Sequence, residues 1–281
     1  MSIQLANPKL LENTELYAVV APWNAPHYDY CPLGLEIPSS NRFNPCKLES
    51  EQFLLLLQEM DRITFGPEGM PMPRWVFYNC SEVPGGIVGF GKRAALLSDH
   101  ERKVLSIPSG YDGLVPFSMF IAIPMLPSGD WMGHNLCSLN GVFPEAGLRG
   151  LGSTTKALGL KVYRTRRLFG ATQWRSRALH IHLKFGPLDL VTAFTPAHSE
   201  SMTLTYRVDL NDACLRAACG DPDVRLDRPA VDFWLDTDDV DAAISLQDKI
   251  EAGGRFQIVE RPKHDGDKIY LPISEPHSKD N

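Results

Sequence analysis

The chain has 281 residues, of which 43% are hydrophobic and 22% are charged, and its formal net charge is −6. This composition is typical of a folded globular protein, and an acidic chain is not expected to bind nucleic acid in general. The sequence contains no run of 18 apolar residues and no N-terminal signal pattern, so we expect a cytoplasmic protein that does not enter a membrane. The six cysteines form no CxxC pair, which predicts reduced thiols and no metal site.

The first 47 residues are rich in proline, asparagine and aromatic residues, and they predict an extended segment with a strand at residues 16–20. A helix is predicted at 50–63, because Ser50 can cap it and its apolar residues fall on one side. The β-rich runs 75–78 and 87–90 predict a hairpin.

Two longer β-rich runs, 115–126 and 132–142, predict antiparallel strands before a glycine-dense segment at 147–153. Residues 154–168 then predict a helix that is entered directly from the glycines. Further strands are expected at 188–194 and 202–208, a helix at 240–250, and a strand pair at 256–259 and 269–271 around Asp265-Gly266. This order predicts a mixed α/β fold, without the regular alternation of a doubly wound sheet.

The most informative segment is the loop Pro144-Glu145-Ala146-Gly147-Leu148-Arg149-Gly150-Leu151-Gly152-Ser153, between a predicted strand and a predicted helix. Glycines allow backbone N–H groups to converge on one point, and the following helix adds the positive end of its dipole. Such an arrangement binds a pyrophosphate. The spacing matches neither the dinucleotide pattern GxGxxG nor the nucleotide pattern GxxxxGK[ST].

The loop resembles the coenzyme A loop of the GNAT (N-acetyltransferase) superfamily, commonly Pro-Glu-Tyr-Arg-Gly-Arg-Gly-Leu-Gly-Ser. Seven of the ten positions agree: Pro144, Glu145, Arg149, Gly150, Leu151, Gly152 and Ser153. The family's core signature, Arg/Gln-x-x-Gly-x-Gly/Ala, is broken at its first position by Gly147. This departure removes a side chain but leaves the backbone amides that bind the anion.

The resemblance implies a central, mostly antiparallel twisted sheet flanked by helices. It suggests an N-terminal extended segment at 1–47, a GNAT-like core at 48–210 and a C-terminal extension at 211–281 packed on that core. It also implies acetyl-CoA or another acyl-CoA as co-substrate, with the pantetheine arm pairing near Asn140 and Val142. The implied cofactor-binding residues are Asn140, Val142, Gly147, Leu148, Arg149, Gly150, Leu151, Gly152, Ser153 and Thr154.

Residues 176–186 resemble a short helix of the family in which the catalytic tyrosine falls on His182. An imidazole could protonate the departing thiolate or accept a proton from the amine. Tyr206, on the last predicted core strand, is a second catalytic candidate. The alternation of 179–185 is by itself typical of a strand, in which His180 and His182 would share a solvated face or offer two metal ligands.

Three features of the sequence each allow two interpretations. Asn140-Gly141 could be a hairpin turn or part of the cofactor site. The basic run Lys161, Arg164, Arg166 and Arg167 could be a solvated helix face or could meet the adenosine phosphates. Residues 23–30 could line an acceptor site or pack in the core. The acceptor would be a small-molecule or peptide amine, and the C-terminal extension could support a homodimer.

Two other functions compete with acyl transfer. The loop also resembles the lysine motif of acetoacetate decarboxylase, with Gly147, Gly152 and Lys156 matched and the reactive lysine replaced by Thr155. That interpretation requires residues 154–168 to be extended, whereas the acyltransferase requires a helix there. The third possibility is an acyl-CoA-binding module without catalysis.

Overall fold

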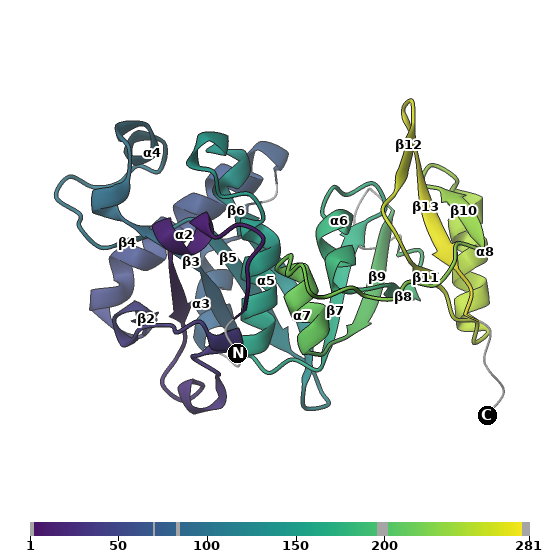
Figure 1. Cartoon of the computed structure of the whole chain (residues 1–281), viewed down its shortest axis with the longest axis horizontal. Helices are drawn as coiled ribbons and strands as arrows, with labels where there is room; N and C mark the ends of the chain where they lie inside the picture. Colours follow the sequence, from purple (N-terminus) through teal and green to yellow (C-terminus); the bar gives the residue numbers. More distant parts are fainter. Residues whose placement is uncertain (1–2, 70, 83–84, 196–201, 277–281) are drawn as a thin grey trace. The chain divides into compact units, whose positions relative to one another are not determined.

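The computed structural model describes residues 3–69, 71–82, 85–195 and 202–276 (Figure 1). Contacts within the chain divide it into two compact units, residues 1–165 with 219–222, and residues 166–218 with 223–281. The boundary after Thr165 lies inside the stretch 48–210 that the resemblance suggested as one core. Both units combine a mostly antiparallel sheet with flanking helices, in agreement with a mixed α/β fold.

The sheet of the first unit consists of β1 (Glu15–Val19), β2 (Arg42–Phe43), β3 (Gly86–Arg93), β4 (Leu114–Pro116), β5 (Ser118–Pro124) and β6 (Asp130–Ser138). The strand order within this unit is β6-β5-β3-β1-β2, and β4 pairs with β3. Only β1 and β2 run parallel among these described pairs. The strands predicted at 16–20 and 87–90 are therefore present, and the run 115–126 forms β4 and β5.

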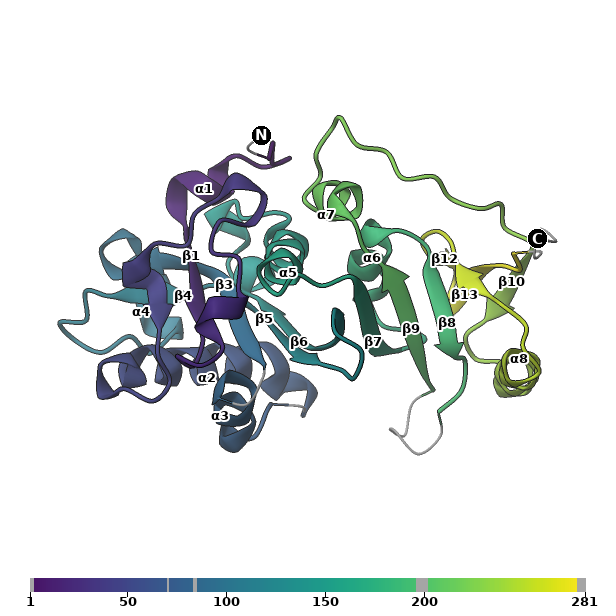
Figure 2. The same ribbon diagram turned by 90° about the horizontal axis from the view of Figure 1, so that it is seen from below.

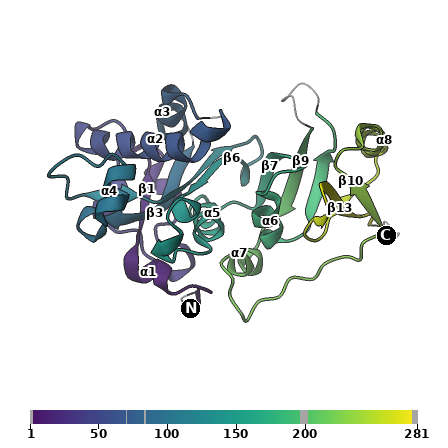
Figure 3. The same ribbon diagram turned by 90° about the horizontal axis from the view of Figure 1, so that it is seen from above.

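The helices of the first unit are α1 (Lys9–Asn13), α2 (Glu51–Phe65), α3 (Arg74–Glu82), α4 (Asp99–Val104) and α5 (Leu151–Val162). Helix α5 packs on one face of the sheet, against β3, β5 and β6. Helices α2 and α3 cover the opposite face (Figures 2 and 3). The close packing of α5 depends on Gly159, where a Cβ atom would lie 2.8 Å from Cδ1 of Phe120.

Helix α3 corrects the predicted hairpin, because residues 75–78 are helical and only 87–90 belong to a strand. The physical reason is the spacing of the buried residues Phe77 and Cys80, which lie three apart and face the sheet together. The helix predicted at 50–63 is confirmed as α2, although Ser50 makes no side-chain cap hydrogen bond. The helix predicted at 154–168 is confirmed as α5, but it ends at Val162.

The sheet of the second unit consists of β7 (Arg167–Gln173), β8 (Leu188–Thr192), β9 (Thr203–Asp209), β10 (Phe233–Asp236), β11 (Gln257–Ile258), β12 (Lys263–Asp265) and β13 (Lys268–Ser274). The strand order within this unit is β7-β9-β8-β11-β13-β10. Strand β12 pairs with β13 through the predicted turn at Asp265-Gly266, and β11 pairs with the far end of β13.

The helices of the second unit are α6 (Leu179–His182), α7 (Asp212–Ala218) and α8 (Val240–Glu251). Helices α6 and α7 lie on one face of its sheet and α8 on the other (Figures 2 and 3). Helix α6 continues as a 3-10 turn at Leu183–Phe185, so residues 179–185 are helical, as the resemblance implied, and not a strand. Within the described residues, no helix is both long and apolar enough to cross a lipid bilayer.

Candidate functional site

The connection from β6 to α5 carries the predicted phosphate loop. Strand β6 ends at Ser138, so Asn140 and Val142 do not belong to the strand that was predicted to reach residue 142. A 3-10 turn at Leu139–Gly141 follows, in which Ser138 Oγ donates to Asn140 Oδ1 at 2.5 Å. Asn140-Gly141 is thus not the turn of a hairpin, because the chain leads on into a helix.

Left-handed glycines shape the loop itself. Gly147 has φ 67° and Gly150 has φ 88°, which are conformations that other residues adopt only with strain. Gly147 follows the 3-10 turn Pro144–Ala146, and Gly150 immediately precedes α5. Left-handed residues that alternate with right-handed ones turn successive N–H groups to one side, and this is the geometry of an anion-binding nest.

Several of the loop's amide groups form no internal hydrogen bond. Four of them donate to no acceptor within the part of the chain that the structure describes, those of Leu148, Arg149, Gly150 and Gly152. By contrast, Leu151 N donates to Leu148 O at 3.1 Å, and Thr154 N donates to Gly150 O at 3.0 Å, which begins the helix. The loop therefore offers several donors together with the N-terminus of a twelve-residue helix.

Asn7 holds the opposite side of the loop. Its Nδ2 donates to Gly147 O at 2.8 Å and to Arg149 O at 3.1 Å. The segment before it is fixed in turn, because Ala6 N donates to Cys219 O at 3.3 Å. In a trans peptide the C=O and N–H groups point in opposite directions. Because Asn7 binds the carbonyl groups of Gly147 and Arg149, the N–H groups of Leu148 and Gly150 point away from Asn7. Sequence reasoning missed Asn7, because it lies 140 residues from Gly147 and no local pattern marks it.

The structure brings the predicted loop residues together as one continuous turn. Leu148 is 1% exposed and anchors the loop in the core, whereas Arg149 is exposed. Leu151, Gly152, Ser153 and Thr154 form the buried first turn of α5. The side chains of this turn are therefore packed, and the exposed surface of the loop is mainly backbone.

Further along α5, Thr155 and Lys156 are fully buried. The Thr155 hydroxyl lies 2.6 Å from that of Ser118 on β5, which ties the helix to the sheet. Burial lowers the pKa of Lys156 from its ordinary value to about 7. Because these residues are helical, the extended geometry that the decarboxylase interpretation requires is absent from 151–162.

The two predicted catalytic residues lie side by side in the second unit. The ring centroids of His182, on α6, and Tyr206, on β9, are 5.0 Å apart. Tyr206 is 2% exposed, and burial raises the pKa of its phenol far above the ordinary value. A phenol with a raised pKa stays protonated at neutral pH and gives up its proton less readily than a free tyrosine.

A further histidine lies on β6 in the first unit. The register of β5 and β6 shifts at Ile121/Ala122, so that Asn135 and Gly133 have partners and His134 between them is skipped. Such β-bulges redirect a side chain and are frequent beside active sites. Desolvation lowers the pKa of His134, which favours the neutral imidazole that a general base requires. Sequence reasoning did not single out His134, because a bulge has no signature in one strand alone.

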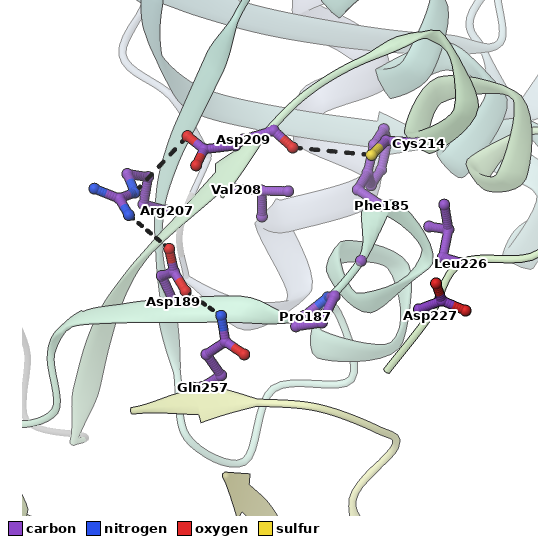
Figure 4. Close-up of a pocket in the computed structure, with 11 residues that line it drawn as sticks. Phe185, Pro187, Asp189, Arg207, Val208, Asp209, Cys214, Leu226, Asp227 and Gln257 are labelled. Carbon is purple, nitrogen blue, oxygen red and sulfur yellow. Dashed lines mark hydrogen bonds and ion pairs between the residues drawn. The ribbon is translucent and has the colours of Figure 1, made fainter. Parts of the chain in front are cut away.

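A small cavity of about 240 Å³ lies in the second unit (Figure 4). On its wall, Arg207 Nη2 is 2.7 Å from Asp189 Oδ2, and Gln257 Nε2 donates to Asp189 Oδ1 at 2.5 Å. On the other side, Cys214 Sγ is 3.8 Å from the backbone oxygen of Asp209. Asp189 is thus paired on both oxygens, whereas the buried Nε of Arg207 has no hydrogen-bond partner among the described residues. The described residues contain no cluster of three or more His, Cys, Asp or Glu side chains that could hold a metal ion.

Two other predicted features have structural roles or are not formed. Tyr28 is buried and donates its hydroxyl to Gly85 O at 3.1 Å, so this residue packs in the core, whereas Trp23 and His27 in the same stretch are exposed. The basic run Lys161, Arg164, Arg166 and Arg167 does not form one helix face, so its interpretation as a solvated helix face was wrong. Helix α5 ends at Val162, Arg164 is left-handed with φ 54°, and Arg167 begins β7.

Comparisons with known proteins add little. No protein-family model matches the sequence, and no curated protein is significantly similar to it. One solved structure that resembles it is that of a candidate acetyltransferase of the GNAT family from Desulfovibrio desulfuricans, with 10% sequence identity and a TM-score of 0.38. The match covers 70% of this chain and 99% of that chain. A likeness at this level establishes neither a shared fold nor a shared activity.

Proposed function

We propose that this protein transfers an acetyl or other short acyl group from an acyl-coenzyme A to an amine. The observation that carries the proposal is the loop between β6 and α5. Its open amides at Leu148, Arg149, Gly150 and Gly152 precede a helix N-terminus, and a pyrophosphate offers the acceptors that these donors lack. The resemblance of the loop sequence to the coenzyme A loop then favours this cofactor over a nucleotide.

Acyl transfer to an amine needs a base for the amine, donors for the tetrahedral oxyanion, and an acid for the departing thiolate. His182 is the first candidate for proton transfer, and Tyr206 beside it is the second. Within the unit that carries the loop, His134 is a separate candidate for the base, because the lowering of its pKa favours the neutral imidazole. The acceptor would be a small-molecule or peptide amine.

Binding can be tested by titration calorimetry with acetyl-CoA on the full chain. We expect binding to the natural sequence and at least about tenfold weaker binding to Gly150→Ala, because a Cβ at φ 88° strains the loop out of its nest geometry. Gly110→Ala is the matched control, since Gly110 has φ 79° with no atom near its Cβ position and lies in another turn of the same unit. Equal affinity of all three proteins would exclude the loop as the cofactor site.

Catalysis is tested separately by thiol release from acetyl-CoA in the presence of a panel of amines. Release that depends on an amine supports the transferase. Binding of acetyl-CoA without release, over amino acids, polyamines, amino sugars and peptide N-termini, would instead indicate an acyl-CoA-binding module.

A further inference from the structure

A second cavity in the second unit has a composition unlike the rest of this acidic chain. Its volume is about 480 Å³, within the range of about 300–1,000 Å³ that small-molecule sites occupy. It lies among α6, the 3-10 turn after it, the extended segment before β10, and the start of β12. Its lining residues are His180, Leu183, Lys184, Arg228, Glu260, Arg261, Pro262 and Lys263.

The charge of this lining is strongly positive. The lining has four Lys or Arg side chains and one carboxylate, Glu260, whereas the whole chain carries a net charge of −6. Glu260 attracts Arg228 electrostatically, but one carboxylate offsets only one of the four cations. Cations that converge on a concave surface against the net charge of the protein create a local potential that attracts anions.

Arg228 is held rigidly at the wall of the cavity. Its Nη2 donates to Leu183 O at 2.6 Å, and its Nη1 donates to Val259 O. Both acceptors are backbone carbonyls, which position the guanidinium without cancelling its charge. Desolvation lowers the pKa of Arg228, and the nearby Glu260 opposes that shift.

We propose that this cavity binds a small polar molecule that carries a phosphate group. Guanidinium groups bind phosphate oxygens through paired hydrogen bonds, and lysines add point charges, so Arg228 and Arg261 together with Lys263 suit a phosphate. The remainder of the ligand is polar, because only Leu183 and Pro262 are apolar among the lining residues. A sugar phosphate or a phosphorylated polyol fits this surface, because most of its lining side chains are polar or charged.

The site is independent of the proposed acyl transfer. Every lining residue belongs to the second unit, whereas the loop before α5 belongs to the first. The Gly150→Ala protein separates the two, because it should lose acetyl-CoA binding and keep binding of the phosphate ester. Failure of one proposal would therefore leave the other standing.

The test is titration calorimetry of the full chain at constant ionic strength. The probes are inorganic phosphate, glycerol 3-phosphate and glucose 6-phosphate, with glycerol, glucose and sulfate for comparison. We expect the phosphate esters to bind more tightly than inorganic phosphate or sulfate, and the parent alcohols not to bind. No binding of any phosphorylated probe at millimolar concentration, or equal binding of sulfate and the esters, would overturn the proposal.

The variant Arg261→Gln/Lys263→Gln removes two exposed cations from the cavity. We expect at least about tenfold weaker binding of the preferred ester, as loss of two charge-assisted hydrogen bonds implies. The matched control is Lys249→Gln/Arg255→Gln, which removes the same charge from exposed positions of the same unit outside the cavity. A similar loss of affinity in both double variants would show that only the overall charge of the protein matters, and it would contradict a defined site. Unchanged unfolding temperatures establish that both variants are folded.

Discussion

Asn7 and Gly150 shape the phosphate loop from its two sides. Gly150 supplies the left-handed backbone that turns the amides outward, and Asn7 bonds to the carbonyl groups on the other side. The role of Gly150 could be predicted, because the glycine pattern of the loop is visible in the local sequence. The role of Asn7 could not, because its partners are distant along the chain and only the folded structure brings them together.

Replacement of Asn7 by alanine should weaken binding of acetyl-CoA by about three- to tenfold. The change removes two hydrogen bonds, each contributing roughly 0.5–1.5 kcal/mol, and part of that energy keeps the loop ordered before the ligand arrives. Calorimetry on Asn7→Ala measures the effect. Asn13→Ala is the control, because Asn13 bonds only weakly to Lys9 O at 3.5 Å. An affinity of Asn7→Ala equal to that of the control would show that the loop needs no support from this segment.

Replacement of His182 by phenylalanine should lower kcat for acyl transfer by about 10²-fold or more if its imidazole transfers a proton. The ring keeps the contact with Tyr206, so the dissociation constant of acetyl-CoA should not change. Steady-state kinetics at saturating acetyl-CoA measures this change in kcat. His180→Phe, on the same helical turn, is expected to retain activity. Full turnover by His182→Phe would remove this residue from the catalytic candidates and leave Tyr206 and His134.

At the scale of single elements, periodicity identified helices and strands where one face is buried, as in α2 and α8. It was wrong at residues 75–78, where a short β-rich run forms part of α3. It also conflicted with the resemblance at residues 179–185, which alternate like a strand but fold as a helical turn and a 3-10 turn. In runs of four to eight residues, the pattern repeats too few times for periodicity to distinguish a helix from a strand.

The close packing of α5 on the first sheet gives a prediction at this scale. Gly159→Val should destabilise the protein by about 1–3 kcal/mol, because its Cβ would lie 2.8 Å from the Phe120 ring. Denaturant unfolding measures the free energy. Gly141→Val is the control, since nothing lies within 4 Å of its Cβ position. Equal stability of the two variants would mean that the helix can shift outward without cost.

At the scale of the whole molecule, the class of mixed α/β fold could be predicted, but the division into two units could not. No proline-rich or glycine-rich linker marks the boundary after Thr165, and the basic run at that point leads directly from α5 towards β7. The return of residues 219–222 to the first unit is likewise invisible in the sequence, since it depends on contacts such as that between Ala6 N and Cys219 O.

Burial of Lys156 makes the stability of the whole protein depend on pH. The pKa of lysine is about 10.4 in an unfolded chain and is lowered to about 7 here. Between these values the unfolded chain binds a proton that the folded protein lacks, so the free energy of unfolding should rise with pH across this window. Below about pH 7 both states are protonated and this contribution no longer changes.

Lys156→Met should remove most of this slope, which approaches about 1.4 kcal/mol per pH unit for one proton, and should stabilise the protein near neutral pH. Denaturant unfolding at several pH values between 7 and 10 tests this. Lys103→Met, at an exposed position on α4, should leave the slope unchanged. A slope that persists in Lys156→Met would assign the pH dependence to other groups.

The contact between Asn7 and the loop has a practical consequence for purification. An affinity tag attached close to Asn7 would compete with the contacts of its side chain to Gly147 O and Arg149 O. A tag that displaced Asn7 would loosen the loop and lower the measured affinity for acetyl-CoA, even though the fusion remained folded. Ligand screens should therefore use protein with the tag removed or placed at the other end.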